Sequence, residues 1–534
     1  MANVNQENKK TGVTYVYESE SYWDKEKQQS RSRRKCIGKL DPETGKLIFS
    51  KKYLVEKELE ALKKRPPGPV PAVVSKRLFH GATYLFDAIG ERLGVTCDLR
   101  QCFPDTYDKI LSVAYYLIME DRNSLSRFPK WGRTHMHPYG KELPSQRISD
   151  LFSSIGEHAK QQFFQAQSSR RLETEYLAYD TTSISSYSKL MKQVKWGKNK
   201  DNDPLPQINL ALVYGQESRI PVYYRKLLGN ISDVMTVQKM LADIDFLKLD
   251  KVQLVMDRGF YSEVNVNALY QKHYKFLMAT RIGLSFVQKY LGPVKESMQS
   301  RSAYSSKDRL NYHSQTIPWA YNETKKRSGE VVTSEKRLYL HLFHNDQRAV
   351  DDKIEFNILL DQLEEELICD QRKPSHESLY AKYYDVNKTP KRGIQLTPKQ
   401  EAIDEAKKNY GYFALISNGI KDPLEALQIY RVKDVIEKAF GNLKERLNMR
   451  RTSVSSEENL DGKLFVQFVA LIYLAYIDKV MRTNNLYKDY TMQGLLDELD
   501  VIELFKQPGK KHHIGEMTKK QLAIYQLFGF DPPL

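Results

Sequence analysis

The chain has 534 residues, with 83 lysine and arginine against 67 aspartate and glutamate, which gives a formal net charge of +16. A chain of this length can form several domains, and its positive charge favours contact with phosphates, as in DNA-binding, RNA-binding and ribosome-associated proteins. The four cysteines are too few for a disulfide framework and lack zinc-site spacing, which excludes a disulfide-stabilised scaffold and fits a reducing compartment.

The amino-terminal part is predicted to hold two regions. Residues 1–65 contain alternating, strand-like pieces and a turn signal at 41–45, which predict a small β module. The proline-rich segment 66–71 is a predicted domain boundary. Residues 72–170 show helical periodicity with scattered basic side chains, and we interpret them as a helical DNA-binding region. A purely structural helical bundle is the alternative.

Two aspartates follow apolar, strand-like segments. Asp180 is predicted to close a buried strand that begins near residue 175, and Asp257 to close a second one that begins at residue 252. Because ligands gather where the strands of α/β folds end, we expect these carboxylates to lie at one end of a sheet. The alternative for each aspartate is a turn residue or a helix N-cap.

The remaining elements are predicted from periodicity and length. Residues 171–282 are predicted to form three strands followed by a helix, a strand, a helix and a strand. The interval 283–405 is too long for a loop in a compact domain, which predicts an insertion domain with a strand at 336–344 and a helix at 353–366. Residues 406–485 form the second part of the core in this prediction, and residues 486–534 form a helical tail.

The longest apolar run, residues 465–477, contains Gln467 and is too short to span a bilayer. We therefore expect a buried helix there and no membrane partner. The first ten residues lack the apolar core of a secretion signal. We expect a cytoplasmic protein.

Tyr430, Lys433, Glu437 and Lys444 stand at helical spacing. At 100° per residue these four positions fall within about a sixth of a turn, so one face of a predicted helix carries a carboxylate flanked by two cations and a phenol. The apolar residues of the same segment occupy an adjacent arc that would pack on a core. The alternative is the ordinary exposed polar face of an amphipathic helix.

Together these residues resemble the DDE transposases of bacterial insertion sequences, in the group marked by Tyr-x-x-Arg-x-x-x-Glu-x-x-x-x-x-x-Lys around the third acidic residue. Tyr430, Glu437 and Lys444 match this signature in register. Lys433 stands where arginine is usual, which keeps a positive charge but loses the bidentate fork of a guanidinium. The other segments that resemble this family, the first two those of one long subgroup, are 15–17, 36–41, 197–200, 206–209, 228–233 and 257–261.

The resemblance implies an α/β fold with a ribonuclease-H-like catalytic core interrupted by a β-rich insertion, an N-terminal β module and a helical DNA-binding region. It implies a transposase that binds the terminal inverted repeats of an insertion sequence, cleaves the DNA ends and joins them to target DNA. Its partners would be double-stranded DNA and, in the DNA complex, a second copy of the chain, because two ends must be held together. The expected location is the bacterial cytoplasm, at the nucleoid when bound to DNA.

The resemblance also implies that Asp180, Asp257 and Glu437 are the catalytic residues and hold two Mg²⁺ or Mn²⁺ ions, with Asp180 bridging both. Carboxylates suit this task because Mg²⁺ prefers oxygen ligands, and two metal ions neutralise the charge that develops when a phosphodiester is cleaved. The predicted DNA-binding residues are Tyr430, Lys433, Lys444 and Arg258.

Two other functions stay open from the sequence. A ribonuclease-H-like nuclease of repair or defence would use the same three carboxylates without a joining step. A DNA-binding derivative would bind repeats without cutting, but the presence of all three acids does not favour it.

Overall fold

The computed structural model describes residues 2–9, 11–24, 28–42, 44–63, 75–120, 124–170, 175–188, 190–247, 252–324, 331–389 and 393–534. The chain forms two compact units. The first contains Met1–Tyr84, Arg133–Met136 and Leu496–Leu534, and the second contains Leu85–Gly132 and His137–Leu495. Each unit has its own sheets and helices.

The first unit contains two antiparallel sheets. One is the expected β module, whose four strands pair in chain order and are followed by a helix: β1 (Ala2–Glu7), β2 (Thr14–Asp24), β3 (Gln29–Leu40), β4 (Leu47–Phe49) and α1 (Lys51–Lys63). The other combines strands that are distant in the sequence: β5 (Lys76–Phe79) pairs with β18 (Glu503–Lys506), which pairs with β19 (His513–Ile514). The predicted boundary at 66–71 lies outside the described residues.

The carboxyl-terminal segment, which we predicted to be helical, therefore also holds a hairpin. Its helices are α18 (Met492–Asp500) and α19 (Lys519–Phe528). The Thr518 side chain accepts a hydrogen bond from the Gln521 amide at the start of α19, and the Gln521 side chain accepts one from the Thr518 amide. This reciprocal capping satisfies two amides at the start of α19.

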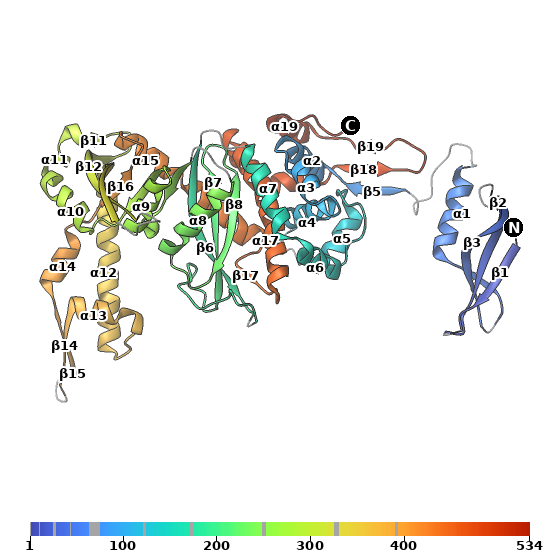
Figure 1. Cartoon of the computed structure of the whole chain (residues 1–534), viewed down its shortest axis with the longest axis horizontal. Coiled ribbons are helices and arrows are strands. Elements are labelled where there is room, and N and C mark those ends of the chain that lie inside the picture. Colours follow the sequence, from blue (N-terminus) through green and yellow to red (C-terminus); the bar gives the residue numbers. More distant parts are fainter. Residues whose placement is uncertain are drawn as a thin grey trace. The chain divides into compact units, whose positions relative to one another are not determined.

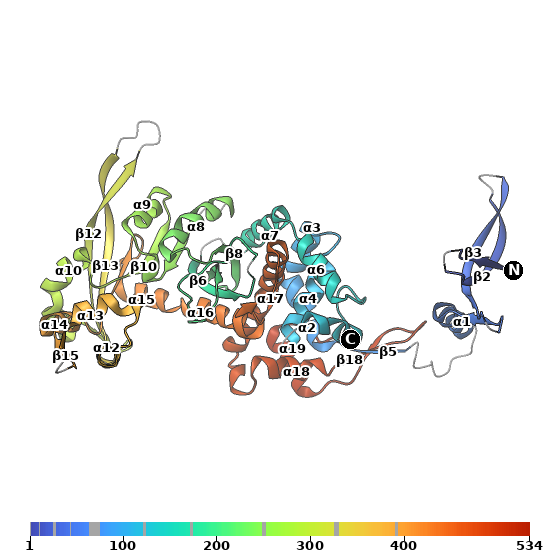
Figure 2. The same cartoon turned by 90° about the horizontal axis from the view of Figure 1, so that it is seen from below.

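In the second unit, a group of helices packs around one long helix, α17 (Glu457–Thr483). The other helices of this group are α2 (Gly81–Arg92) from Leu85 onward, α3 (Val95–Cys102), α4 (Tyr107–Met119), α5 (Phe128–Thr134) up to Gly132, α6 (Ser145–Ser154) and α7 (Glu157–Ser169). In Figure 2, α17 lies beside α4 and α6. Residues 464–475 of α17 are all buried, and Gln467 donates a side-chain hydrogen bond to the Leu447 carbonyl.

By length and composition alone, α17 is long and apolar enough to cross a membrane, yet 78% of its most apolar window is buried inside the fold. Aromatic rings from neighbouring helices cover it. The ring of Phe465 lies 5.1 Å from that of Phe103 and 5.4 Å from that of Phe163, measured between centroids. The buried helix expected at residues 465–477 is therefore confirmed.

One large mixed sheet forms the centre of the second unit (Figure 1). Its first part has the strand order β8-β7-β6-β9-β10, in which β6, β9 and β10 are parallel and β7 is antiparallel to both of its neighbours. This is the arrangement of a ribonuclease-H-like core, as expected. The strands and crossing helices are β6 (Tyr176–Ser186), β7 (Gln207–Gly215), β8 (Pro221–Leu228), α8 (Asp233–Leu247), β9 (Gln253–Met256), α9 (Glu263–Gln271) and β10 (Lys275–Thr280).

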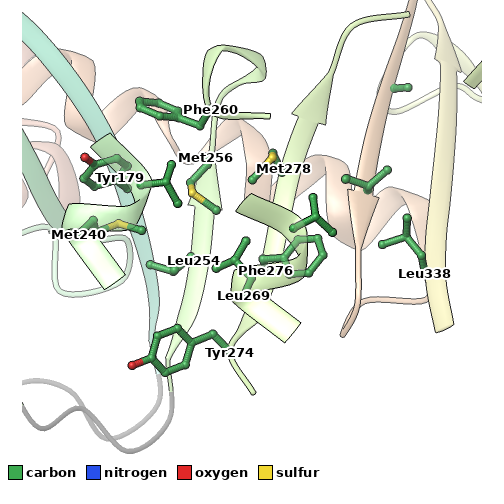
Figure 3. Close-up of a cluster of buried hydrophobic side chains, with 14 of the residues drawn as sticks. Tyr179, Met240, Leu254, Met256, Phe260, Leu269, Tyr274, Phe276, Met278 and Leu338 are labelled. Carbon is green, nitrogen blue, oxygen red and sulfur yellow. The ribbon is translucent and has the colours of Figure 1, made fainter. Parts of the chain in front are cut away.

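Both faces of this sheet are covered. On one face Tyr179, Met256 and Phe260 belong to a buried cluster with side chains of α8 and α9 (Figure 3). On the other face Val255 and Leu277 pack against α15 (Pro423–Arg431). Parallel strands that are buried on both faces are typically near-continuous apolar runs, and the residues of β9 and β10 follow that rule. The central strands therefore lie between helices on both faces.

The insertion contains a separate two-stranded sheet, β14 (Tyr384–Thr389) paired with β15 (Gly393–Pro398), but most of its strands belong to the core sheet. Its long hairpin, β12 (Leu310–Thr324) and β13 (Val331–His344), joins the core sheet through β16 (Tyr412–Ser417), which pairs with both β13 and β10. The predicted strand at 336–344 lies within β13, and the predicted helix at 353–366 lies within α12 (Asp346–Ile368). The other elements of the insertion are α10 (Ser285–Leu291), α11 (Lys295–Met298), β11 (Tyr304–Ser305), α13 (Glu377–Tyr383), β14 (Tyr384–Thr389), β15 (Gly393–Pro398) and α14 (Gln400–Lys407).

Candidate active site

Asp180 and Asp257 lie side by side on neighbouring parallel strands. The register of β6 against β9 pairs Tyr179 with Met256, so the residue that follows each of these is an aspartate. Asp257 directly follows β9, as predicted. The prediction that Asp180 closes its strand is wrong, because β6 continues to Ser186 and Asp180 lies within it. The polar residues that follow Asp180 are buried and hydrogen-bonded, so the strand continues beyond the aspartate.

Asp180 is the most buried of the three predicted catalytic carboxylates, with 15% of its side chain exposed. Burial raises the pKa of Asp180 above its ordinary value, against the opposing attraction of Lys200 and Lys433. Its Oδ1 accepts a hydrogen bond of 2.7 Å from the Thr181 amide. Burying a carboxylate with incomplete compensation costs free energy, so this position is shaped for something other than stability.

Asp257 has a different environment. Its Oδ1 accepts hydrogen bonds from the Arg258 amide at 2.7 Å and from the Tyr430 hydroxyl at 2.8 Å. Burial raises the pKa of this carboxyl, but Lys433 and these hydrogen bonds outweigh it, so the pKa is lowered from its ordinary value. Asp257 also caps the short helical turn of residues 258–260, the alternative role that the sequence left open. Capping leaves its second oxygen facing Lys433.

Glu437 comes from a helix that is broken where the sequence predicted continuity. α15 ends at Arg431, Lys433 is the N-cap of α16 (Asp434–Gly441), and a π-helical turn, η6 (Asn442–Arg446), follows. The Glu437 side chain is 60% exposed. The apolar residues predicted to support this helix are buried: Val435, Ile436, Ala439, Phe440, Leu443 and Leu447.

Lys433 lies between the three carboxylates. Its Nζ is 3.8 Å from an Asp180 oxygen, 3.8 Å from an Asp257 oxygen and 3.3 Å from Glu437 Oε1. Only 7% of the Lys433 side chain is exposed. Burial lowers the pKa of this ammonium, but the three carboxylates raise it by more, so its pKa lies above the ordinary value. One cation thus gathers acidic groups from β6, the end of β9 and α16.

The other predicted DNA-binding residues are placed differently. The Tyr430 hydroxyl donates to Asp257, and its pKa is raised because burial and the neighbouring Asp257 disfavour the phenolate. Arg258 is exposed next to Asp257. Lys444, on the π-helical turn, forms its ion pair with Asp201 at 2.7 Å. The structure therefore brings Tyr430, Lys433 and Glu437 to the aspartates, and it pairs Lys444 with a loop residue.

A second cation, Lys200, reaches the site from the segment between β6 and β7. Its Nζ lies 3.7 Å from Asp180 and 3.6 Å from Asp233, and it donates to the carbonyl and the hydroxyl of Thr181 at 2.7 and 2.8 Å. The Thr181 hydroxyl donates to Asp233 at 2.6 Å. Our site prediction omitted Lys200 and Asp233, although both lie in segments that carried the family resemblance.

Two glycines explain how the segment that carries Lys200 is positioned. A Cβ on Gly197 would lie 2.2 Å from the Gly229 carbonyl oxygen, and a Cβ on Gly229 would lie 1.8 Å from the Gln207 carbonyl oxygen. Contacts this close exclude any side chain, so only glycine fits at both positions. The Gly229-Asn-Ile-Ser-Asp233 stretch therefore supports the site with a close backbone contact and with Asp233.

The donor chemistry fits a hard divalent cation. All three side chains offer carboxylate oxygens, the ligands that Mg²⁺ prefers, and the Lys433 ammonium shows that they can surround one cation. Across the described ranges, no three histidine, cysteine, aspartate or glutamate side chains are close enough together to hold a metal ion in the present arrangement. Metal binding would therefore require the carboxylates to move closer together.

Comparison with known proteins identifies the family of this chain. The transposase DDE domain family matches residues 171–473. A solved structure of the piggyBac transposase in a synaptic complex with hairpin DNA is similar with 12% sequence identity and a TM-score of 0.34, over 78% of this chain and 70% of that chain. No curated protein sequence matches the chain. Since the family match spans more than half of the chain and includes all three carboxylates, this protein belongs to the DDE transposase family.

Proposed function

We propose that this transposase binds the terminal inverted repeats of its own element, cleaves the DNA ends and joins them to target DNA, with two divalent metal ions held by Asp180, Asp257 and Glu437. The observation that carries the proposal is the convergence of these carboxylates, from three elements distant in the sequence, on one cation position. Family membership supports strand cleavage and transfer in general. The choice of ligands rests on the geometry.

Metal ions held by Asp180, Asp257 and Glu437 would supply Lewis-acid activation of the attacking oxygen and charge stabilisation of the leaving oxygen of a phosphodiester. The residues of the chain position these oxygens. Asp180, on a strand buried on both faces, supplies the rigid part of the site, while the exposed Glu437 can adjust from α16. The Tyr430 hydroxyl holds Asp257 in place, and Arg258 is exposed beside it for a DNA phosphate.

The same site would serve cutting and joining. Water would first attack the phosphodiester at the end of the element and release a 3′-hydroxyl. That hydroxyl would then attack a phosphodiester of target DNA, so each step breaks one phosphorus–oxygen bond and forms another. Because two ends must be joined to one target, we propose that the active complex contains two copies of the chain.

This function is tested with purified protein, Mg²⁺ or Mn²⁺, and DNA that carries the terminal repeats of the element. We expect wild-type protein to nick at the ends and to join them to target DNA. Glu437→Gln, which keeps the size of the side chain and removes its charge, should bind the DNA and do neither. Cutting without joining would identify a nuclease, and binding without cutting by the wild type would identify a DNA-binding derivative.

An exposed basic loop near Asp180 is the proposed contact for the DNA end. Trp196 is 70% exposed, and its neighbours Lys192, Lys195 and Lys198 are exposed as well. The loop is nevertheless anchored, because the Lys195 backbone pairs with Gln207. The exposed Trp196 indole and the lysine ammonium groups around it are suited to bind a nucleic-acid strand, because bases stack on aromatic rings and phosphates pair with cations.

Trp196→Ala is therefore expected to weaken binding to a repeat duplex with an unpaired 3′ end by about tenfold, the usual size of one base-stacking contact. Fluorescence anisotropy with a labelled duplex would measure this change. Leu190→Ala is the matched control, because Leu190 is 84% exposed in the same loop and has no ring. An equal loss in both variants would argue against stacking, as would no loss in either.

A further inference from the structure

Lys433 stands among the three carboxylates that are the proposed metal ligands. Its ammonium is within 3.8 Å of all three carboxylates and is nearly excluded from solvent. An oxygen ligand lies about 2.0 to 2.1 Å from Mg²⁺, so the carboxylates must move inward when they bind metal, into the space that the ammonium fills. The lysine and the metal ion therefore compete for one place and for the same negative charge.

The two ammonium groups near Asp180 are held in different ways. Lys200 donates two short hydrogen bonds to Thr181, which are independent of the carboxylates. Within the described part of the chain, Lys433 Nζ makes a single hydrogen bond, to Glu437 at 3.3 Å, and its other partners are carboxylates at ion-pair distance. Attraction to the three acids is thus what keeps Lys433 in place. Because the lysine side chain is a flexible four-carbon chain, its ammonium can move to another anion that attracts it more strongly.

We propose that the Lys433 ammonium is the counter-cation of the catalytic carboxylates in the free transposase. When DNA binds, a phosphate attracts this ammonium away from the carboxylates, and a metal ion takes the space that it occupied. The proposal rests on the proposed function, since it takes Asp180, Asp257 and Glu437 as the metal ligands. In the free protein the ammonium opposes metal binding. In the DNA complex it pairs with phosphate, so DNA and metal each strengthen the binding of the other by the same factor.

The Lys433 ammonium would limit metal binding to transposase that already holds DNA. A transposase that took up metal without DNA would carry a hydrolytic centre open to any nucleic acid that it met. With Lys433 in place, the metal site is completed mainly on protein that already holds a phosphate beside α16. Arginine, the usual residue of the signature at this position, has a larger planar head that would fill the same space differently.

The test compares Mn²⁺ affinity with and without DNA, measured from the electron paramagnetic resonance signal of free Mn²⁺. The DNA is a pre-cut terminal-repeat duplex without target, so that no cleavage accompanies binding. Lys433→Met should bind Mn²⁺ about tenfold more tightly than wild type in the absence of DNA, since a nearby opposing charge is removed. With DNA bound, the two proteins should agree within about twofold, because the lysine has already left.

Lys438→Met is the matched control. Lys438 follows Glu437 on α16 and is exposed, and its substitution removes the same charge from the same helix. It should bind Mn²⁺ as the wild type does in both states. Lys433→Gln, with a polar head of similar reach, serves as a second variant if the methionine disturbs the fold, which a thermal melt would reveal.

Three results would overturn the proposal. An equal gain for Lys433→Met with and without DNA would mean that the ammonium stays among the carboxylates in the complex. No gain in the free protein would mean that it does not compete with metal. If Glu437→Gln left Mn²⁺ binding unchanged, the ligand set would be wrong, and the proposed function would fail together with this inference. The first two results leave the ligand assignment standing.

Discussion

Asp180→Asn is expected to reduce strand cleavage by about a thousandfold or more, because metal ions supply several kcal/mol of charge stabilisation in the transition state and each 1.4 kcal/mol is tenfold in rate. Asp180 is the most buried of the three carboxylates and lies within the strand next to β9, so its geometry cannot be restored by a shift of the backbone. Single-turnover nicking of a terminal-repeat duplex with Mg²⁺ would measure the loss.

The same substitution should leave the fold intact. The pKa of Asp180 is raised in the folded protein, mainly by burial, so above that pKa the charged side chain destabilises the fold relative to the unfolded chain. Asparagine removes that charge, and we expect a melting temperature equal to or above that of the wild type. Loss of cleavage with unchanged stability and DNA binding would separate a catalytic role from a structural one.

Asp385→Asn is the control for this experiment. Asp385 lies on β14 with 64% of its side chain exposed and forms an ion pair of 3.1 Å with Lys399 at the surface. Its substitution should change neither cleavage nor stability measurably, because exposed ion pairs contribute little. Cleavage at the normal rate by Asp180→Asn would refute the assignment of Asp180 as a metal ligand.

Gly229→Ala is expected to destabilise the protein by about 3 kcal/mol and to lower cleavage as well, since overpacking of a tight contact typically costs 1 to 3 kcal/mol. The new Cβ would meet the Gln207 carbonyl oxygen at 1.8 Å, and backbone atoms cannot turn aside as a side chain can. Relief would have to come from the backbone of Gln207, which pairs with Lys195, or from Gly229 itself. Either shift would displace the loop that carries Lys200.

Chemical unfolding would measure the change in stability of Gly229→Ala. Gly441→Ala is the matched control, because a Cβ on Gly441 meets no atom within 4 Å and the residue is the last of α16. It should be unchanged or slightly more stable, since alanine is the better helix former. If both variants unfolded at the same denaturant concentration, the close contact at Gly229 would not be needed for the fold.

Much of the candidate site was accessible from the sequence because its signals are local. The Glu437 signature depends on spacing within one short helical segment. The succession of strands and helices in residues 171–282 follows from apolar periodicity, and the structure confirms it. The burial of residues 465–477 follows from their composition. Such properties depend on neighbours in the chain and need no knowledge of distant partners.

Two predictions failed where distant partners decide the outcome. The hydroxyl residues after Asp180 suggested the end of a strand, but β6 continues because those residues are buried with partners from another segment. The Ser183 hydroxyl, for example, donates to Asn209 and accepts from the Lys200 amide. Likewise, the regular helix expected through Tyr430 and Lys444 is broken at Lys433 and ends in a π-helical turn, which brings Lys444 to Asp201.

By itself, the sequence determined the family of this protein and the order of the core elements, and it led to the proposal of the three acidic residues. Only the tertiary structure decided that the insertion extends the core sheet through β16, that Lys200 and Asp233 adjoin Asp180, and that Lys433 lies among all three carboxylates. The physical reason is that a motif reports which groups are present. Charge compensation depends on which groups the packing of separate elements brings within a few ångströms of one another.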